Sequence, residues 1–189
     1  MRDLFSINSK RVFIAIEFED SIKRYLHDIQ NKVVQVSEKG NFTSKENFHL
    51  TLKFIGEVKI DKIENINKCI DDVAINQSKF KLYFDTLGQF PRGDKSIVWV
   101  GLKSNEMLNE IYQDLEISLE TIGIKREDRK LTPHTTLGRQ VVFNEEFGKL
   151  VEMINIEDMT ILVDKISLME STREDGELKY IPIDVKKFR

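Results

Sequence analysis

Residues 47–56 read Asn-Phe-His-Leu-Thr-Leu-Lys-Phe-Ile-Gly, and residues 133–139 read Pro-His-Thr-Thr-Leu-Gly-Arg. Both segments contain the pattern His-x-Thr-Leu. In a β-strand, residues i and i+2 point to the same face about 6 to 7 Å apart, so each segment presents an imidazole and a hydroxyl side by side. This spacing suits contact with one phosphate group, and two of the three histidines of the chain fall in these segments. The two motifs therefore predict a two-histidine site.

The rest of the chain predicts an alternation of strands and helices. β-rich or alternating runs predict strands through both motifs and at residues 11–17, 80–87, 96–102, 160–169 and 180–185. Apolar residues at helical spacing predict helices from Asp20, as the cap, to about Gly40, and at residues 61–75, 108–122 and 145–154. Residues 88–94 and 125–130 read as loops, the first from its glycine and proline content.

This order predicts an α+β fold with a duplicated plan. A helix precedes each motif at a comparable distance, so we expect a pseudo-twofold arrangement of two antiparallel sheets in two lobes. Helices would cover the outside, and the motif strands would face each other across a central cleft. We expect residues 1–189 to form one such bilobal domain.

Composition limits the classes of protein to which the chain belongs. With 189 residues, 40% of them hydrophobic, the chain can bury a core of ordinary size. The formal net charge of −3 excludes a general basic field for long nucleic acid, so an anionic substrate needs a local patch. The single cysteine, Cys69, suits a reducing compartment. Residues 1–10 do not resemble a signal peptide, and no apolar run reaches the ~20 residues that cross a bilayer. We expect a cytoplasmic, monomeric protein with no membrane association.

At the two motifs the sequence resembles the 2H phosphoesterases, and more narrowly the LigT-like RNA 2′,3′-cyclic phosphodiesterases, long described as bacterial and archaeal 2′-5′ RNA ligases. The resemblance rests on segments that span nearly the whole chain: residues 11–16, 47–58, 99–101 and 133–139, and more loosely Glu170-Ser171 and Tyr180. It implies hydrolysis of a terminal 2′,3′-cyclic phosphate of RNA to a 2′-phosphate, with reversible 2′-5′ ligation as a further activity. It also implies that His49 donates a proton to the leaving 3′ oxygen and that His134 acts as general base on water.

The chemistry of the motif residues agrees with this resemblance. Opening a cyclic phosphodiester requires a base for the nucleophile and an acid for the departing oxygen, and two histidines can supply both near pH 7. The hydroxyls of Thr51 and Thr136 would donate to the non-bridging oxygens. We expect no cofactor or metal, because two histidines and two threonines offer too few ligands for catalytic zinc. From the residues alone, the acid and the base can exchange roles.

Several other residues are candidates for binding substrate. By alternation, Lys53 shares the face of His49, whereas Arg139 points away from His134 unless Gly138 marks a bulge. Arg11 and Arg129, with Arg126 and Lys130, would form a basic rim. Candidates for stacking on a base are Trp99, Phe90 and Tyr180.

Two other functions remain open at this stage. One is a phosphodiesterase that acts on another cyclic or 2′,5′-linked nucleotide. The other is a module that binds nucleotides without turning them over.

Overall fold

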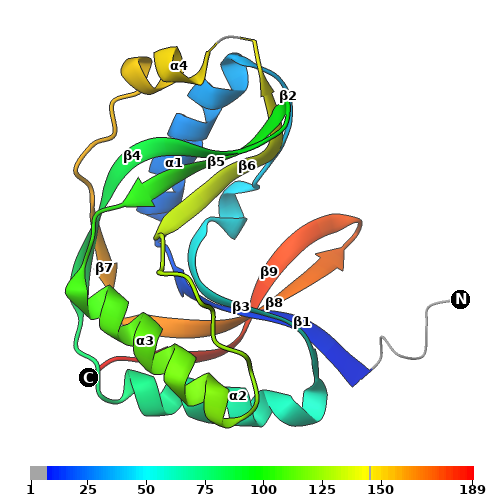
Figure 1. Cartoon of the computed structure of the whole chain (residues 1–189), viewed down its shortest axis with the longest axis vertical. Coiled ribbons are helices and arrows are strands. Elements are labelled where there is room, and N and C mark those ends of the chain that lie inside the picture. The colour runs from blue at the N-terminus through cyan, green and yellow to red at the C-terminus, as the bar shows by residue number, and fades with distance from the viewer. Residues whose placement is uncertain (1–7, 145) are drawn as a thin grey trace, which may run out of the picture.

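The four-stranded sheet is built around β1 (Ser9–Glu17), in which residues 12–16 are all at most 3% exposed. A continuous buried run of this kind requires cover on both faces, as predicted for a central strand. The computed structural model describes residues 8–144 and 146–189 (Figure 1). The order in this sheet is β3-β1-β8-β9, with every pair antiparallel. The other strands are β3 (His49–Lys59), β8 (Lys165–Glu174) and β9 (Glu177–Lys187).

A five-stranded sheet forms the second lobe, in the order β2-β6-β5-β4-β7 and again antiparallel throughout. Its strands are β2 (Ser37–Phe42), β4 (Phe80–Arg92), β5 (Lys95–Leu102), β6 (His134–Phe143) and β7 (Thr160–Val163). The central strand β5 buries Val98 and Val100 completely. The second His-x-Thr motif, in β6, pairs with β5 as the first motif, in β3, pairs with β1.

Helices pack against both lobes. They are α1 (Asp20–Gln35), α2 (Ile60–Ala74), α3 (Glu106–Thr121) and α4 (Phe147–Met153), with a 3-10 turn η2 (Lys45–Asn47). Helix α1 follows β1 of the four-stranded sheet but contacts β2 and β6 of the five-stranded sheet. Helix α3 follows β5 of the five-stranded sheet but lies beside α2, which contacts β3, β8 and β9 (Figure 1). Each lobe is thus covered by the helix that leaves the central strand of the other.

The same plan occurs twice along the chain, as β1-α1-β3 and as β5-α3-β6. In both halves a central strand leads to a helix and then to an antiparallel motif strand beside the first strand. The predictions of an α+β fold, two antiparallel sheets and outer helices are confirmed. No helix within the described residues is long and apolar enough to cross a membrane.

The predicted elements differ from the structure at several places. The first helix was expected to reach Gly40, but it ends at Gln35, and residues 37–42 form β2 against β6. These residues are mostly polar, so the pairing partner and not the apolar pattern makes the strand. The strand expected at residues 160–169 is two strands, β7 and β8, which lie in different sheets on either side of Asp164. Asp20 is the first residue of α1 and not its cap, which is Glu19.

The loop expected at residues 88–94 is mostly strand. Strand β4 continues to Arg92, and only Gly93 and Asp94 turn the chain into β5. Gly88 is not a turn residue. It makes room for the Trp99 ring, because a Cβ atom at this position would lie 2.1 Å from that ring. The strand of the first motif likewise continues past Gly56, which adopts a φ of 91° within β3.

Candidate active site

A β-bulge interrupts β3 directly after the first motif. Thr51 lies opposite Ala15 and Lys53 lies opposite Ile14, so Leu52 is an additional residue in this strand. An additional residue reverses the alternation of side chains beyond it. Lys53 therefore turns into the protein, and the next residue, not Lys53, joins the face of Thr51.

The prediction that Lys53 shares the face of His49 is therefore wrong. The Lys53 side chain is 3% exposed and lies 2.8 Å from the carboxylate of Glu116, a residue of α3. Its ammonium group also donates to the carbonyl oxygen of Lys125 at 2.9 Å. Lys53 thus stabilises the contact between β3, α3 and the loop before the second motif, and Phe54 takes its place in the cleft.

The second motif is followed by the same kind of bulge. Thr136 lies opposite Trp99 and Gly138 lies opposite Val98, so Leu137 is the additional residue. Arg139 thereby returns to the face of Thr136 and lines the cleft. Alternation alone predicted that Arg139 points away from His134. The exception was a bulge near Gly138, and this bulge is present.

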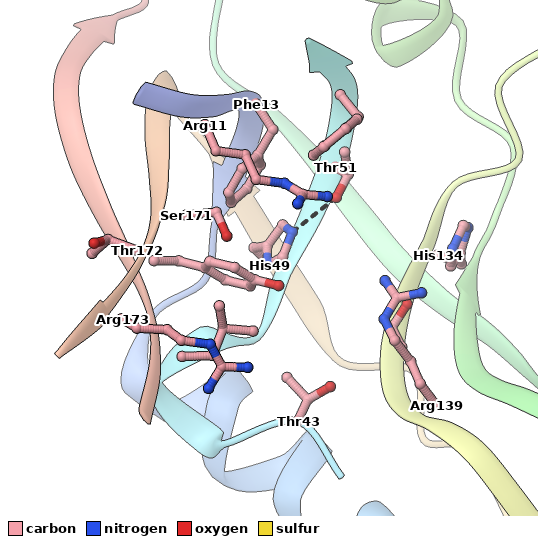
Figure 2. Close-up of a pocket in the computed structure, with 14 residues that line it drawn as sticks. Arg11, Phe13, Thr43, His49, Thr51, His134, Arg139, Ser171, Thr172 and Arg173 are labelled. Atoms are coloured by element: carbon pink, nitrogen blue, oxygen red, sulfur yellow. Dashed lines mark hydrogen bonds between the residues drawn. The ribbon is translucent and has the colours of Figure 1, made fainter. Parts of the chain in front are cut away.

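One cleft of about 810 Å³ brings the motif residues together. Figure 2 shows His49 and Thr51 on one wall and His134 and Arg139 on the other. The cleft is lined by Arg11, Phe13, Thr43, His49, Thr51, Phe54, His134, Thr136, Arg139, Ser171, Thr172, Arg173, Leu178 and Tyr180. The predicted meeting of the two motifs across a cleft is therefore seen in the structure.

The two imidazoles are held in the same way. Nδ1 of His49 lies 2.7 Å from the carbonyl oxygen of Asn47, and Nδ1 of His134 lies 2.7 Å from that of Thr132. A carbonyl oxygen only accepts, so the hydrogen lies on Nδ1 of each ring. Each neutral histidine is left with Nε2 as a free base. In His49 this nitrogen accepts from the hydroxyl of Thr51 at 2.8 Å (Figure 2).

Both histidines are poorer bases than a histidine in water. Burial, and to a smaller extent the positive charges of Arg139 and Lys23, lowers the pKa of His49 to about 4, although its bond to the Asn47 carbonyl opposes the shift. Burial also lowers the pKa of His134, and the charges of Arg139 and Arg129 add to this effect. The free protein therefore holds both imidazoles neutral at pH 7, with the charge of Arg139 acting on both.

Aromatic rings surround each histidine. The His49 ring lies 4.9 Å from that of Phe13 and 5.1 Å from that of Tyr180. The His134 ring lies 5.2 Å from Phe90 and 5.8 Å from Trp99. Of the three predicted stacking candidates, Tyr180 lines the cleft, whereas Phe90 and Trp99 pack around His134.

The predicted basic rim is only partly present. Arg11 lines the cleft, with its guanidinium 5.1 Å from the centre of the Phe54 ring. Arg129 is 85% exposed, donates to Glu127 at 2.8 Å and does not line the cleft, although its charge lowers the pKa of His134. Its role in binding substrate stays a prediction. Arg126 lies 3.8 Å from Glu120. Arg173 lines the cleft and was not predicted, because its strand showed no motif.

Two positioning residues were also missed. The Thr135 hydroxyl donates to the carbonyl oxygen of His49 at 3.1 Å. The Asn47 side chain donates to the Leu178 carbonyl at 2.8 Å and accepts from the Tyr180 backbone N–H at 3.2 Å. Both residues belong to the quoted motif segments, but their partners lie too far along the chain for spacing to indicate them.

The groups in the cleft are suited to acid–base chemistry on an anion. Among residues 8–144 and 146–189, no three His, Cys, Asp or Glu side chains come together in a way that would hold a metal ion. The cleft instead offers two imidazoles, two threonine hydroxyls and several arginines.

Comparison with known proteins agrees with this arrangement. Residues 16–99 match the family model described as LigT like Phosphoesterase, a range that includes the first motif. The chain is 29% identical over 163 residues to a protein of Thermotoga maritima (86% of this chain, 87% of the relative). It is 34% identical over 146 residues to a protein of Methanocaldococcus jannaschii (76% and 79%). Both relatives are named RNA 2′,3′-cyclic phosphodiesterase.

The fold is also that of a solved member of this group. The crystal structure of Escherichia coli LigT complexed with 3′-AMP superposes with a TM-score of 0.80 at 24% identity, covering 95% of this chain and 98% of that one. The identity of 34% to the Methanocaldococcus protein, over 79% of its length, shows common membership of a family and not only a common fold. The chain therefore belongs to the LigT-like phosphoesterases, members of the 2H phosphoesterase superfamily.

Proposed function

We propose that this chain hydrolyses a 2′,3′-cyclic phosphate at the end of RNA to a 2′-phosphomonoester. The observation that carries the proposal is that two neutral imidazoles line one cleft, from opposite sheets, each with Nδ1 bound to a carbonyl and Nε2 unprotonated. The two relatives named RNA 2′,3′-cyclic phosphodiesterase support this substrate.

In the proposed reaction, His134 removes a proton from water, and the water oxygen forms a bond to phosphorus. The bond from phosphorus to the 3′ oxygen breaks, and His49 gives its proton to that oxygen. The product carries a free 3′ hydroxyl and a 2′-phosphate. Each proton transfer of this kind contributes typically 10²- to 10⁴-fold, or roughly 3 to 5 kcal/mol of the barrier. In ligation a 5′ hydroxyl would take the place of water and the histidines would keep these roles, whereas in the reverse reaction, which breaks a 2′-5′ linkage, they would exchange them.

His49 must first gain the proton that it donates. Its pKa of about 4 leaves it neutral at pH 7 in the free protein. A phosphodiester anion beside the ring favours the charged imidazolium and raises this pKa. We therefore propose that the substrate brings His49 into its acidic form and that binding is coupled to proton uptake.

The remaining groups would stabilise charge on the phosphate. The Thr51 hydroxyl, which donates to His49 in the free protein, would turn to a non-bridging oxygen, and Thr136 would donate from the opposite wall. The guanidinium of Arg139, which lowers the pKa of both histidines, lies close enough to act on an anion between them. Arg11 is a further cation of the same cleft. This scheme uses no metal or cofactor.

We further propose that residues 1–189 act as a single domain and as a cytoplasmic monomer. The large hydrophobic core includes residues of both sheets, which favours one folding unit. One buried cysteine, Cys69, suits a reducing compartment.

The test is analysis of the product from a 2′,3′-cyclic nucleotide after treatment of the protein with EDTA. We expect a 2′-phosphate, and loss of turnover in His49→Ala and in His134→Ala. His27→Ala is the matched control, because His27 contacts Gln30 on α1 outside the cleft. A 3′-phosphate product would contradict the assigned leaving group, and turnover abolished by EDTA would contradict the metal-free scheme. Binding without turnover would indicate a nucleotide-binding module instead.

A further inference from the structure

A second cavity, of about 410 Å³, shares Arg139 with the active-site cleft. It lies at the end of the five-stranded sheet, where the turn between β4 and β5 approaches β2 and β6. Its lining is Asn41, Arg92, Lys95, Ser96, Ile97, Arg139 and Gln140. Because one side chain lines both cavities, a ligand that passes Arg139 can occupy the two at once.

The charge of this second cavity is entirely positive. Its lining includes Arg92, Lys95 and Arg139 and contains no carboxylate. None of these three cations forms an ion pair with a carboxylate of the described residues, although Asp94 lies in the turn between two of them. Three unpaired cations in a protein of net charge −3 form the kind of local patch that an anionic polymer requires.

The backbone beside Arg139 forms a bulge between the two cavities. Gly138 lies opposite Val98 and Val141 lies opposite Ser96, so Arg139 and Gln140 bulge out of the pairing with β5. On the β2 side, Arg139 stays paired with Asn41. Gln140 has a φ of 53°, a left-handed conformation that residues other than glycine seldom adopt. Its side-chain oxygen accepts from Asn41 at 3.3 Å. The bulge places amide groups of Asn41 and Gln140 beside the cations, where they can bond to ribose hydroxyls.

The cations on the other side of the cleft are already engaged. Arg173 donates to the Gly176 carbonyl at 2.7 Å, and Arg11 lies over the Phe54 ring. Lys10, nearby on β1, pairs with Glu170. The side of Arg92 and Lys95, in contrast, offers cations that have no ion-pair partner among the described residues.

RNA that ends in a cyclic phosphate continues from its terminal nucleotide in one direction only, toward the 5′ end. When the cyclic phosphate lies between His49 and His134, the next phosphates of the chain must lie outside the reacting site. We propose that the second cavity binds these 5′-side phosphates through Arg92 and Lys95, with Arg139 between it and the reacting phosphate. This inference rests on the proposed function and adds that an RNA strand, not a mononucleotide, is the preferred substrate.

The experiment compares kcat/KM for a cyclic mononucleotide with kcat/KM for a short oligoribonucleotide that ends in the same nucleotide and cyclic phosphate. The readout is the ratio of the oligonucleotide value to the mononucleotide value. We expect this ratio to exceed 1 for the unchanged protein and to fall about tenfold in the double variant Arg92→Gln, Lys95→Gln. The dependence of the oligonucleotide KM on salt should weaken too, with a slope smaller by about 0.7 for each phosphate contact removed.

A control variant removes the same charge elsewhere. Lys62 and Lys79 are exposed and line neither cavity, so Lys62→Gln, Lys79→Gln should keep the ratio of the unchanged protein. An equal ratio in the two double variants would overturn the inference while leaving the proposed function intact. If the unchanged protein hydrolysed neither substrate, the proposed function would fail, and the inference would fail with it.

Discussion

The side-chain hydroxyl of Thr135 donates a hydrogen bond of 3.1 Å to the backbone carbonyl oxygen of His49, a residue 86 positions earlier in the chain and in the other sheet. Thr135 is 1% exposed, so water does not compete for this bond. Its neighbours on either side, His134 and Thr136, belong to the second motif. The bond therefore links the two motif strands at the level of the two imidazoles.

Replacing Thr135 by valine should impair catalysis more than folding. Valine keeps the shape of threonine but removes the donor, and a net hydrogen bond contributes about 1 kcal/mol, or roughly 2 to 4 °C in Tm for a chain of this size. A small shift between the two histidines has a larger effect, so we expect kcat to fall at least about tenfold. Thr135→Ser keeps the hydroxyl and should retain most of the activity. Equal kcat values for the valine and serine variants would show that this bond does not position the histidines.

Asn47 fixes the strand that carries Tyr180 against the His49 segment. Its side chain, 5% exposed, satisfies the Leu178 carbonyl and the Tyr180 N–H together. Asn47→Ala leaves both groups unpaired at about 1 to 3 kcal/mol for each, so we expect urea unfolding to show a loss of about 2 to 6 kcal/mol. The NMR signals of the His49 ring should also shift, because Tyr180 packs against it.

Asn76→Ala is the comparison for this loss, because Asn76 also donates to a backbone carbonyl but is exposed. We expect its midpoint of urea unfolding to match that of the unchanged protein. A similar midpoint for the Asn47 and Asn76 variants would contradict the role assigned to Asn47.

The two bulges mark the positions up to which side-chain alternation predicts the facing of residues correctly and beyond which it fails. Alternation placed His49 with Thr51, and His134 with Thr136, because each pair precedes the additional leucine of its strand. It failed one or two residues later. Lys53 was assigned to the cleft because a local pattern shows neither the bulge at Leu52 nor the partner Glu116 on a distant helix.

The predictions of helices and strands succeeded or failed for the same reason: a local pattern shows spacing along the chain but not distant partners. Helices α2 and α3 were located to within two residues at each end, since their buried side chains recur at helical spacing. Strand β2 was missed because its residues, Ser-Glu-Lys-Gly-Asn-Phe, become a strand only through pairing with β6. Gly88 was read as a turn residue because the Trp99 ring that it accommodates lies on the next strand.

The rate should depend on pH in a way set by the lowered pKa values of both histidines. Turnover requires one imidazole protonated and the other neutral, and the pKa of each lies below 6.5 in the free protein. Above pH 6.5 both rings are neutral, so the active form becomes scarcer as pH rises. We therefore expect kcat/KM to be bell-shaped with a maximum below pH 6.5, whichever histidine is the acid.

The measurement is kcat/KM for a cyclic mononucleotide between pH 4 and pH 9. Because kcat reports the complex with substrate, in which the phosphate raises the pKa of the acid, its alkaline limb should lie at higher pH than that of kcat/KM. A kcat/KM maximum at pH 7.5 or above would contradict the lowered pKa values of the free protein.

The buried pair of Lys53 and Glu116 should matter for stability through charge rather than through contact with substrate. Both side chains are at most 3% exposed, and Glu116 also accepts from the Glu127 N–H at 2.8 Å, in the loop that leads to His134. Lys53→Met leaves a buried carboxylate without its cation, which costs about 3 to 5 kcal/mol.

Replacing both Lys53 and Glu116 by methionine removes the charge as well, so urea unfolding should show the double variant to be more stable than Lys53→Met alone. The double variant should remain below the unchanged protein, because the Lys125 carbonyl and the Glu127 N–H still lose their partners. Lys68→Met, which breaks an exposed pair with Glu64 on α2, should leave the unfolding midpoint unchanged. A double variant less stable than Lys53→Met would mean that the methionine side chains fit the site poorly and that packing, not charge, decides the stability there.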